Sequence, residues 1–173
     1  MIKAIGKGSL ATILAVGLHI VRVVMWLALT GLTIALVLVP VTPALVDWFA
    51  GIDGVTGDID IDIGPGDYVE LLQHFITFAV LLYVVERLLE LLRTLRFGSP
   101  FVKENAVRFR RVGWALLFGE ASKIVIGILA KIFDANVDGG PDLITLISIA
   151  AVFVLSEVFH EGARMKEEQD LTV

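Results

Sequence analysis

The sequence predicts an all-α membrane protein: a single domain of 173 residues built as an antiparallel bundle of four transmembrane helices. Hydrophobic residues make up 57% of the chain and charged residues 19%. Soluble domains contain about 45–50% apolar and about 25% charged residues. The apolar excess lies in blocks longer than about 18 residues, the length that marks a membrane span. Loops of opposite charge alternate between these blocks, as expected for a chain that crosses a bilayer several times.

Positive charge sets the expected orientation. Ten of the fourteen lysines and arginines fall in the segments 1–9, 93–111 and 163–173, and none falls in 40–67 or 134–141. Loops rich in lysine and arginine stay on the cytoplasmic side of a membrane. We therefore expect a multi-pass protein of the bacterial cytoplasmic (inner) membrane with both termini inside and two acidic loops outside.

The first expected span, 10–39, follows a short cationic start and ends at Pro40 and Pro43. Proline ends it because the ring cannot continue helical hydrogen bonding. A basic start before an apolar run also resembles a signal peptide. The apolar core of a signal peptide is about 7–15 residues long, much shorter than this run, so an uncleaved span is favoured.

The second expected span, 68–95, begins after Asp67, a good N-cap with Glu70 three residues later in a capping-box-like pattern. It is the most polar of the four spans, so its polar faces must pack against other helices or extend beyond the bilayer. The remaining expected segments are the cytoplasmic loop 96–111, the third span 112–133, the fourth span 142–162 and the cytoplasmic tail 163–173.

The first outer loop, 40–67, contains the alternating stretch G-D-I-D-I-D-I over 57–63. A period of two predicts a short β-strand or hairpin with the aspartates on one face. These aspartates also match the first three ligand positions of a calcium-binding loop. Ile63 and Val69 occupy the positions where such a loop needs glycine and the closing glutamate. A solvated strand face is therefore favoured over a calcium site.

Three charged residues, Arg22, Glu120 and Lys123, fall near the expected bilayer midplane when depth is counted at about 1.5 Å per residue. Ionisable groups at this depth are costly, are usually paired and are functional candidates. Glu120 and Lys123 are also i,i+3 neighbours on one helix face. A buried network of the three is the hypothesis, either as an ion path or substrate anchor, or as a structural lock on helix register. The structural lock is favoured.

A second polar group lies toward the inner face. Glu157, His160 and Glu161 share one face of the fourth span, and Glu86 and Glu90 lie near the inner end of the second. Two carboxylates and a histidine at this spacing could ligate a metal. Carboxylate-bridged bundles take a carboxylate-x-x-His motif from each of two helices, and this chain has one. Salt bridges are therefore favoured over a metal, and no cofactor is expected.

The sequence contains no strong catalytic signature. It has no Ser-His-Asp arrangement, no H-E-x-x-H and no phosphate loop, and its lack of cysteine excludes disulfides and thiolate metal sites. The net charge of −5 is segregated along the chain and gives no support for nucleic-acid binding. We expect a protein that is not an enzyme. Its expected partners are the lipid bilayer and either a cytoplasmic regulator or a second copy of itself.

Two inner-face stretches have a specific pattern. They run Gly98-Ser99-Pro100-Phe101, Glu104-Asn105, Arg108, Arg110-Arg111 and Gly113, and then Glu157-Val158-Phe159-His160-Glu161-Gly162-Ala163-Arg164 with Glu167-Glu168-Gln169-Asp170-Leu171-Thr172-Val173. This pattern is similar to the bacterial family known only as domain of unknown function 2975. The resemblance extends over the whole chain in its four-span layout. It implies a small inner-membrane protein. Members of this family are often encoded beside a small helix-turn-helix regulator, which implies signalling or control more than metabolism.

The two stretches suggest a folded cytoplasmic cap. Arginines of the basic loop would pair with acidic residues of the tail, and Asn105 would bond exposed helix-end carbonyls. The cap is either the functional surface or a structural closure. The candidate cap residues are Pro100, Phe101, Asn105, Arg108, Arg110, Arg111, Glu157, Glu161, Gly162, Glu168 and Asp170. We expect a regulatory or partner-binding role through this face. The alternative is a small oligomeric transporter or channel that uses Arg22, Glu120 and Lys123.

Overall fold

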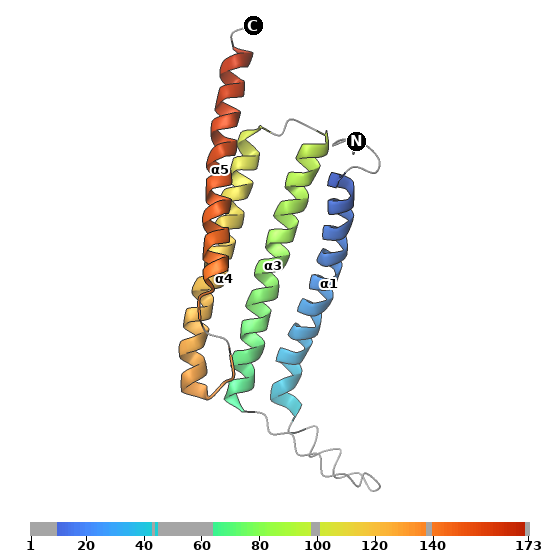
Figure 1. The fold of residues 1–173 in the computed structure, drawn as a ribbon. Helices are drawn as coiled ribbons and strands as arrows, with labels where there is room; N and C mark the ends of the chain where they lie inside the picture. The colour runs from blue at the N-terminus through green and yellow to red at the C-terminus, as the bar shows by residue number, and fades with distance from the viewer. Residues whose placement is uncertain (1–9, 43, 45–63, 98–100, 138–139, 172–173) are drawn as a thin grey trace.

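The computed structural model describes residues 10–42, 44, 64–97, 101–137 and 140–171. Four long helices form nearly all of this part: α1 (Leu10–Leu38), α3 (Pro65–Phe97), α4 (Lys103–Phe133) and α5 (Leu143–Asp170), with a short 3-10 turn, η1 (Val39–Val41), after α1. Consecutive helices run in opposite directions (Figure 1). The all-helical class is confirmed for the described residues, which contain no strand. The strand expected at 57–63 lies outside them.

The start of α3 corrects the expected N-cap. The helix begins at Pro65. Proline is suited to this first position because the N–H group that it lacks would have no partner within the helix. The Asp67 carboxylate reaches back and accepts a hydrogen bond from the Gly64 N–H at 2.8 Å, as the third residue of a capping box does. Glu70 has a different role, because its carboxylate accepts from the Asn136 N–H at 2.9 Å.

The basic stretch before the third span, counted with the cytoplasmic loop 96–111 in the sequence, is helical from Lys103 onward and continuous with that span. α4 begins at Lys103, so the residues expected in the second half of the 96–111 loop form its first turns. Val102 is extended and its carbonyl accepts from the Asn105 N–H at 3.0 Å. At the far end, Asp134 adopts a left-handed conformation with φ of 53°, which ends the helix.

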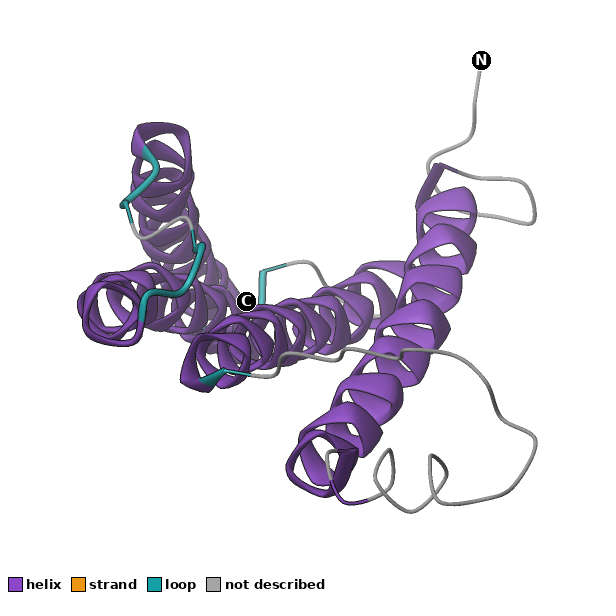
Figure 2. Ribbon diagram, turned by 90° about the horizontal axis from the view of Figure 1, so that it is seen from below, coloured by secondary structure: helices purple, strands orange, loops and turns teal. Residues whose placement is uncertain are grey.

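Packing joins helices that follow one another in the chain: α1 on α3, α3 on α4 and α4 on α5. Figure 2 shows these helices in an open arc. The antiparallel order therefore agrees with the expectation, whereas a bundle around one common core does not form in the described part. α1 has its extensive contact with α3 alone, and large apolar side chains such as Leu27, which is 69% exposed, line its surface.

The pairing of α5 with α4 is shifted in register relative to the expected hairpin. Asp142, just before α5, lies against Glu120, thirteen residues before the last residue of α4. At 1.5 Å per residue, α5 therefore starts about 20 Å inside the far end of α4. Ala135 and Val137 turn back and pack over the apolar cluster of α3 and α4 at that end. At the opposite end α5 projects beyond the other helices (Figure 1).

Small residues explain this register. A Cβ atom on Gly113 of α4 would lie 2.9 Å from the ring of Phe153, and one on Gly162 of α5 would lie 2.5 Å from the ring of Phe101. Ser156 is 2% exposed, and its hydroxyl donates to a backbone carbonyl of α4 at 2.9 Å. Each of these contacts places a small residue directly opposite a phenylalanine ring or a backbone carbonyl, so a shift of α5 along α4 would break all of them.

Two of the described helices are long and apolar enough to cross a bilayer. They are Thr12–Val41 and Leu143–Gln169, whose most apolar 18-residue windows have mean hydropathies of 2.3 and 2.1. α3 and α4 carry charged residues within their length, including Glu86, Arg87 and Glu120. Length and composition thus indicate membrane association through α1 and α5.

Candidate functional site

Most of the predicted cap residues gather where α3 ends, α4 begins and α5 projects, at the top of Figure 1. We call this region the basic end. It contains an aromatic cluster between α4 and α5, a network of arginines and a glutamate between α3 and α4, and a set of exposed charges. Each of these has a different chemical role.

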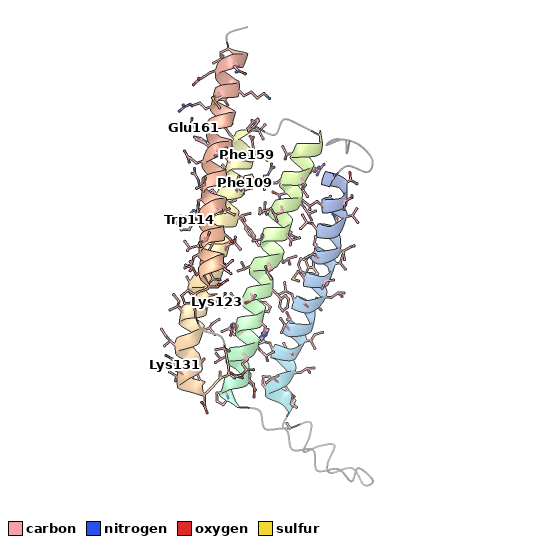
Figure 3. All side chains as sticks on the ribbon, in the orientation of Figure 1. Phe109, Trp114, Lys123, Lys131, Phe159 and Glu161 are labelled. Carbon is pink, nitrogen blue, oxygen red and sulfur yellow. The ribbon has the colours of Figure 1, made fainter. Side chains whose placement is uncertain are left out.

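An aromatic cluster closes α4 against α5. The ring of Phe159 lies 5.6 Å from that of Phe101 and 4.9 Å from that of Phe109, measured between centroids. Figure 3 shows Phe109 and Phe159 at matching heights on the two helices. Gly162 lies directly against Phe101, and Ala163 is buried beside it. Phe101 and Gly162 of the predicted cap therefore have a packing role.

Asn105 and Arg108 connect α4 to α3. Asn105 is completely buried, and its amide oxygen accepts from Arg108 Nη1 at 2.8 Å. The same guanidinium donates to Thr94 Oγ1 at 2.9 Å, and its Nε lies 3.4 Å from Glu90 Oε2. Glu90 also accepts two hydrogen bonds of 2.7 Å from Arg87 Nη1. One carboxylate thus serves two arginines.

The partner of Arg108 corrects the expected pairing with the acidic tail. Arg108 lies on the side of α4 that faces α3, whereas Ala106, whose carbonyl accepts from Ser156, lies on the side that faces α5. At 100° per residue, two positions correspond to a rotation of about 200°, so these two faces point in nearly opposite directions. Arg108 is therefore directed away from the tail.

The acidic residues of the tail pair with other cations. Lys103 Nζ lies 2.7 Å from Glu167 Oε2, and Arg164 lies 2.9 Å from Glu161 and 3.6 Å from Glu168. All these side chains are largely exposed, so each pair contributes at most about 1 kcal/mol to stability. Two remaining cap residues fall outside the description: Pro100 is not among the described residues, and the side chain of Asp170, the last residue of α5, is not described.

Arg110, Arg111, Glu157 and His160 of the basic end are also exposed. Arg110 and Arg111 make no ion pair with any described residue, which corrects their expected pairing with the tail in this part of the chain. Arg111 borders an apolar groove of about 470 Å³ between α3 and α4 that Trp114 also lines. Glu157 and His160 are exposed on α5. No three histidine, aspartate or glutamate side chains of the described residues converge as a metal site requires.

Glu120 anchors the start of α5. It is 5% exposed, its Oε1 lies 2.6 Å from Lys123 Nζ, and its Oε2 accepts from the Asp142 N–H at 3.1 Å. Asp142 caps α5 in turn, because its carboxylate accepts from the N–H groups of Ile144 and Thr145. Sequence analysis found the Glu120–Lys123 neighbours but missed the backbone partner, which only the shifted register of α5 brings into reach.

Arg22 lies apart from this pair. Its Nε is 3.9 Å from Glu86 Oε1 on α3, and no hydrogen bond or ion pair among the described residues joins it to Glu120 or Lys123. The expected three-residue network is divided because α1 packs on α3 and not on α4. Arg22, Glu86 and Arg93 line a cleft of about 460 Å³ between α1 and α3. Arg22 and Glu86 lie at similar depths on consecutive helices, and this feature of the sequence would have identified Glu86 as the partner of Arg22.

Comparison with known proteins gives one match. A family model described as "Protein of unknown function (DUF2975)" matches residues 68–173. The matched segment begins near the start of α3 and includes α4 and α5, while α1 lies outside it. It is shorter than the whole-chain resemblance expected from the sequence. Neither the curated proteins nor the solved structures give a match.

Proposed function

We propose that this chain, which belongs to the DUF2975 family through residues 68–173, is a four-span protein of the bacterial cytoplasmic membrane that binds a cytoplasmic partner through its basic end. It acts without catalysing a reaction. One observation carries the proposal: the interior of the basic end is packed, with Arg108 bonded to Asn105 and Glu90, whereas Arg110 and Arg111 on its surface are exposed and make no ion pair with any described residue. Exposed charges without an internal role are available for another molecule.

The four-span placement has physical support from all four helices. α1 and α5 are apolar enough to cross, and the charged side chains of α3 and α4 that lie deepest are paired, as Glu120 is with Lys123. In this placement α5 starts within the bilayer rather than at its surface. Backbone N–H groups at such depth must be bonded inside the protein. The carboxylates of Glu120 and Asp142 supply those bonds.

Reporter fusions test this topology. Green fluorescent protein, which fluoresces only when folded in the cytoplasm, is expected to be bright after residues 99 and 173. Alkaline phosphatase, which is active only outside, is expected to be active after residues 55 and 139. The reason is that lysines and arginines retain the segments that carry them on the inside. Active phosphatase after residue 99 or 173 would contradict the orientation.

The proposed partner is a cytoplasmic protein with an acidic surface, because Arg110 and Arg111 are adjacent, exposed and unpaired among the described residues. The helical position of the two arginines directs them to different sides of α4, so the partner contacts a broad surface rather than one point. The projecting end of α5 extends this surface beyond the other helices (Figure 1). A second copy of the chain is the other occupant that the experiment below detects.

Charge reversal of these arginines is expected to abolish partner capture. The variant Arg110→Glu/Arg111→Glu leaves the aromatic cluster and Asn105 unchanged. A partner that copurifies from native membranes in mild detergent is expected to fall by about tenfold or more, because like charges then face each other. The measurement is the amount of copurified protein per mole of bait, identified by mass spectrometry.

The matched control is Lys131→Glu, a charge reversal at the exposed far end of α4. It is expected to capture the partner as well as the wild type. If the Arg110→Glu/Arg111→Glu variant captures as much partner as the wild type, with unchanged circular dichroism, the proposal is contradicted. Loss of a self-association, rather than of a second protein, assigns the surface to a dimer.

The alternative, a small oligomeric transporter or channel through Arg22, Glu120 and Lys123, has less support. The geometry divides these residues between two places, and Glu120 is already bonded to a lysine and a backbone N–H. A carboxylate held on both oxygens is poorly suited to bind and release an ion.

A further inference from the structure

The cleft between α1 and α3 is the most polar cavity beside α1. α1 contributes His19 and Arg22 to its wall, and α3 contributes Glu86, Glu90 and Arg93. The three α3 residues follow the i, i+4, i+7 spacing of one helix face, so they form a continuous polar stripe opposite α1. His19 Nδ1 lies 2.7 Å from the Ala15 carbonyl oxygen and is therefore occupied by its own helix. The arginines are the groups available to a ligand.

Two arginines and two glutamates line the cleft, and two further arginines bind one of these glutamates from outside the cleft wall. Glu90 is shared by two arginines outside the cleft wall, as described above, so Glu86 is the carboxylate that remains for both Arg22 and Arg93. Four guanidinium groups thus accompany two carboxylates, which leaves an excess of two positive charges. The groups counted are Arg22, Arg87, Arg93, Arg108, Glu86 and Glu90.

The cleft arginines are also incompletely bonded. The contact of Arg22 with Glu86 is long, at 3.9 Å, and both side chains remain more than a third exposed. Arg93 makes no ion pair with any described residue. On the side of α3 that faces α4, the Nε of Arg87 is a buried donor with no hydrogen-bond partner in the described part. The region has more guanidinium donors than acceptors.

We propose that this cleft binds a phosphate group through Arg22 and Arg93. Guanidinium groups match phosphate oxygens with two parallel hydrogen bonds, and two arginines across a cleft supply the charge that a phosphate needs. Basic clefts between helices at the inner membrane surface bind anionic lipid headgroups in this way. An apolar surface of α1, lined by Val16, Ile20 and Val23, adjoins the cleft at His19 and offers a path for an acyl chain.

The phosphate has two chemical sources, an anionic phospholipid headgroup or free inorganic phosphate. The apolar surface beside the cleft favours the lipid. This inference goes beyond partner binding at Arg110 and Arg111 and does not depend on it. It requires only the contact of α1 with α3.

Native mass spectrometry of the full chain in detergent tests the proposal. Wild-type protein is expected to retain phosphatidylglycerol about tenfold more tightly than phosphatidylcholine. Arg22→Gln and Arg93→Gln are each expected to weaken phosphatidylglycerol binding about tenfold or more, as the loss of a charge-assisted hydrogen bond does. Lys131→Gln, which removes one exposed positive charge from the far end of α4, is expected to bind like the wild type.

A parallel titration with inorganic phosphate distinguishes the two sources. Displacement of the lipid by millimolar phosphate, with the same dependence on Arg22 and Arg93, supports the site and assigns it to free phosphate. Unchanged phosphatidylglycerol binding in both glutamine variants overturns the proposal, as does equal binding of both lipids without any phosphate binding. If the glutamine variants unfold, Arg22→Lys and Arg93→Lys can replace them, because lysine keeps the positive charge but lacks the planar guanidinium group. These variants are expected to bind phosphatidylglycerol at an intermediate level.

Discussion

Replacement of Glu120 by alanine is expected to lower the free energy of unfolding by about 1–3 kcal/mol, the cost of leaving partly buried polar groups without their acceptor. Two groups lose their acceptor at once. Lys123 Nζ lies 2.6 Å from Glu120 Oε1, and the Asp142 N–H donates to Oε2. The second loss acts on the first turn of α5, so we also expect the end of this helix to fray.

Reversible unfolding in mixed micelles, followed by circular dichroism, measures this effect. Glu120→Gln keeps an oxygen for the Asp142 N–H but loses the charge, so it is expected to fall between the wild type and Glu120→Ala. Lys123→Ala added to Glu120→Ala is expected to cost little more, because contacting residues are not additive. The control Lys131→Ala lies exposed on the same helix and is expected to change stability by about 0.5 kcal/mol or less.

A small effect of Glu120→Ala has a direct functional meaning. If the variant loses less than about 1 kcal/mol, the carboxylate is not needed to hold the start of α5. That result would favour the hypothesis of transport through the buried charges, and a flux assay on Glu120→Gln would be the next experiment. A large effect supports the structural lock that the sequence favours.

Substitution of Gly162 by alanine is expected to destabilise the protein by about 1–3 kcal/mol, the usual cost of overpacking a closed contact. A Cβ atom there would lie 2.5 Å from Cδ1 of Phe101 and 2.9 Å from its Cε1. The ring also packs on Phe159, at 5.6 Å between centroids, so moving it disturbs the aromatic cluster. Leucine at this position is expected to cost more than alanine.

A double-mutant cycle isolates this contact. Phe101→Ala removes the ring, so Gly162→Ala in that background is expected to lose most of its cost. Gly31→Ala is the matched control, because nothing lies within 4 Å of the Cβ position and the helix gains about 0.5–1 kcal/mol from the loss of a glycine. If Gly162→Ala behaves like Gly31→Ala in the same unfolding assay, the aromatic closure does not set the register of α5.

Local features of the sequence are enough to predict the helices and the family. The apolar block near the amino terminus and the proline after it predict α1 and its end, which the structure places at Leu38 before a turn at Val39–Val41. The two stretches with a specific pattern predict the family, and the matching family model includes both. These features are readable because apolar runs, proline and motif residues act through local backbone rules.

Which faces of the helices meet depends on how the helices pack, and local sequence does not specify this. Between membrane helices, apolar side chains have no hydrophobic reason to prefer one another over lipid, so small residues and polar groups select the contacts. Gly113 and Gly162 place α5 far along α4, which brings the Asp142 N–H to Glu120. The same packing leaves α1 beside α3, which gives Arg22 the partner Glu86. The sequence contains every one of these residues, but their pairing depends on a register that only the packed helices determine.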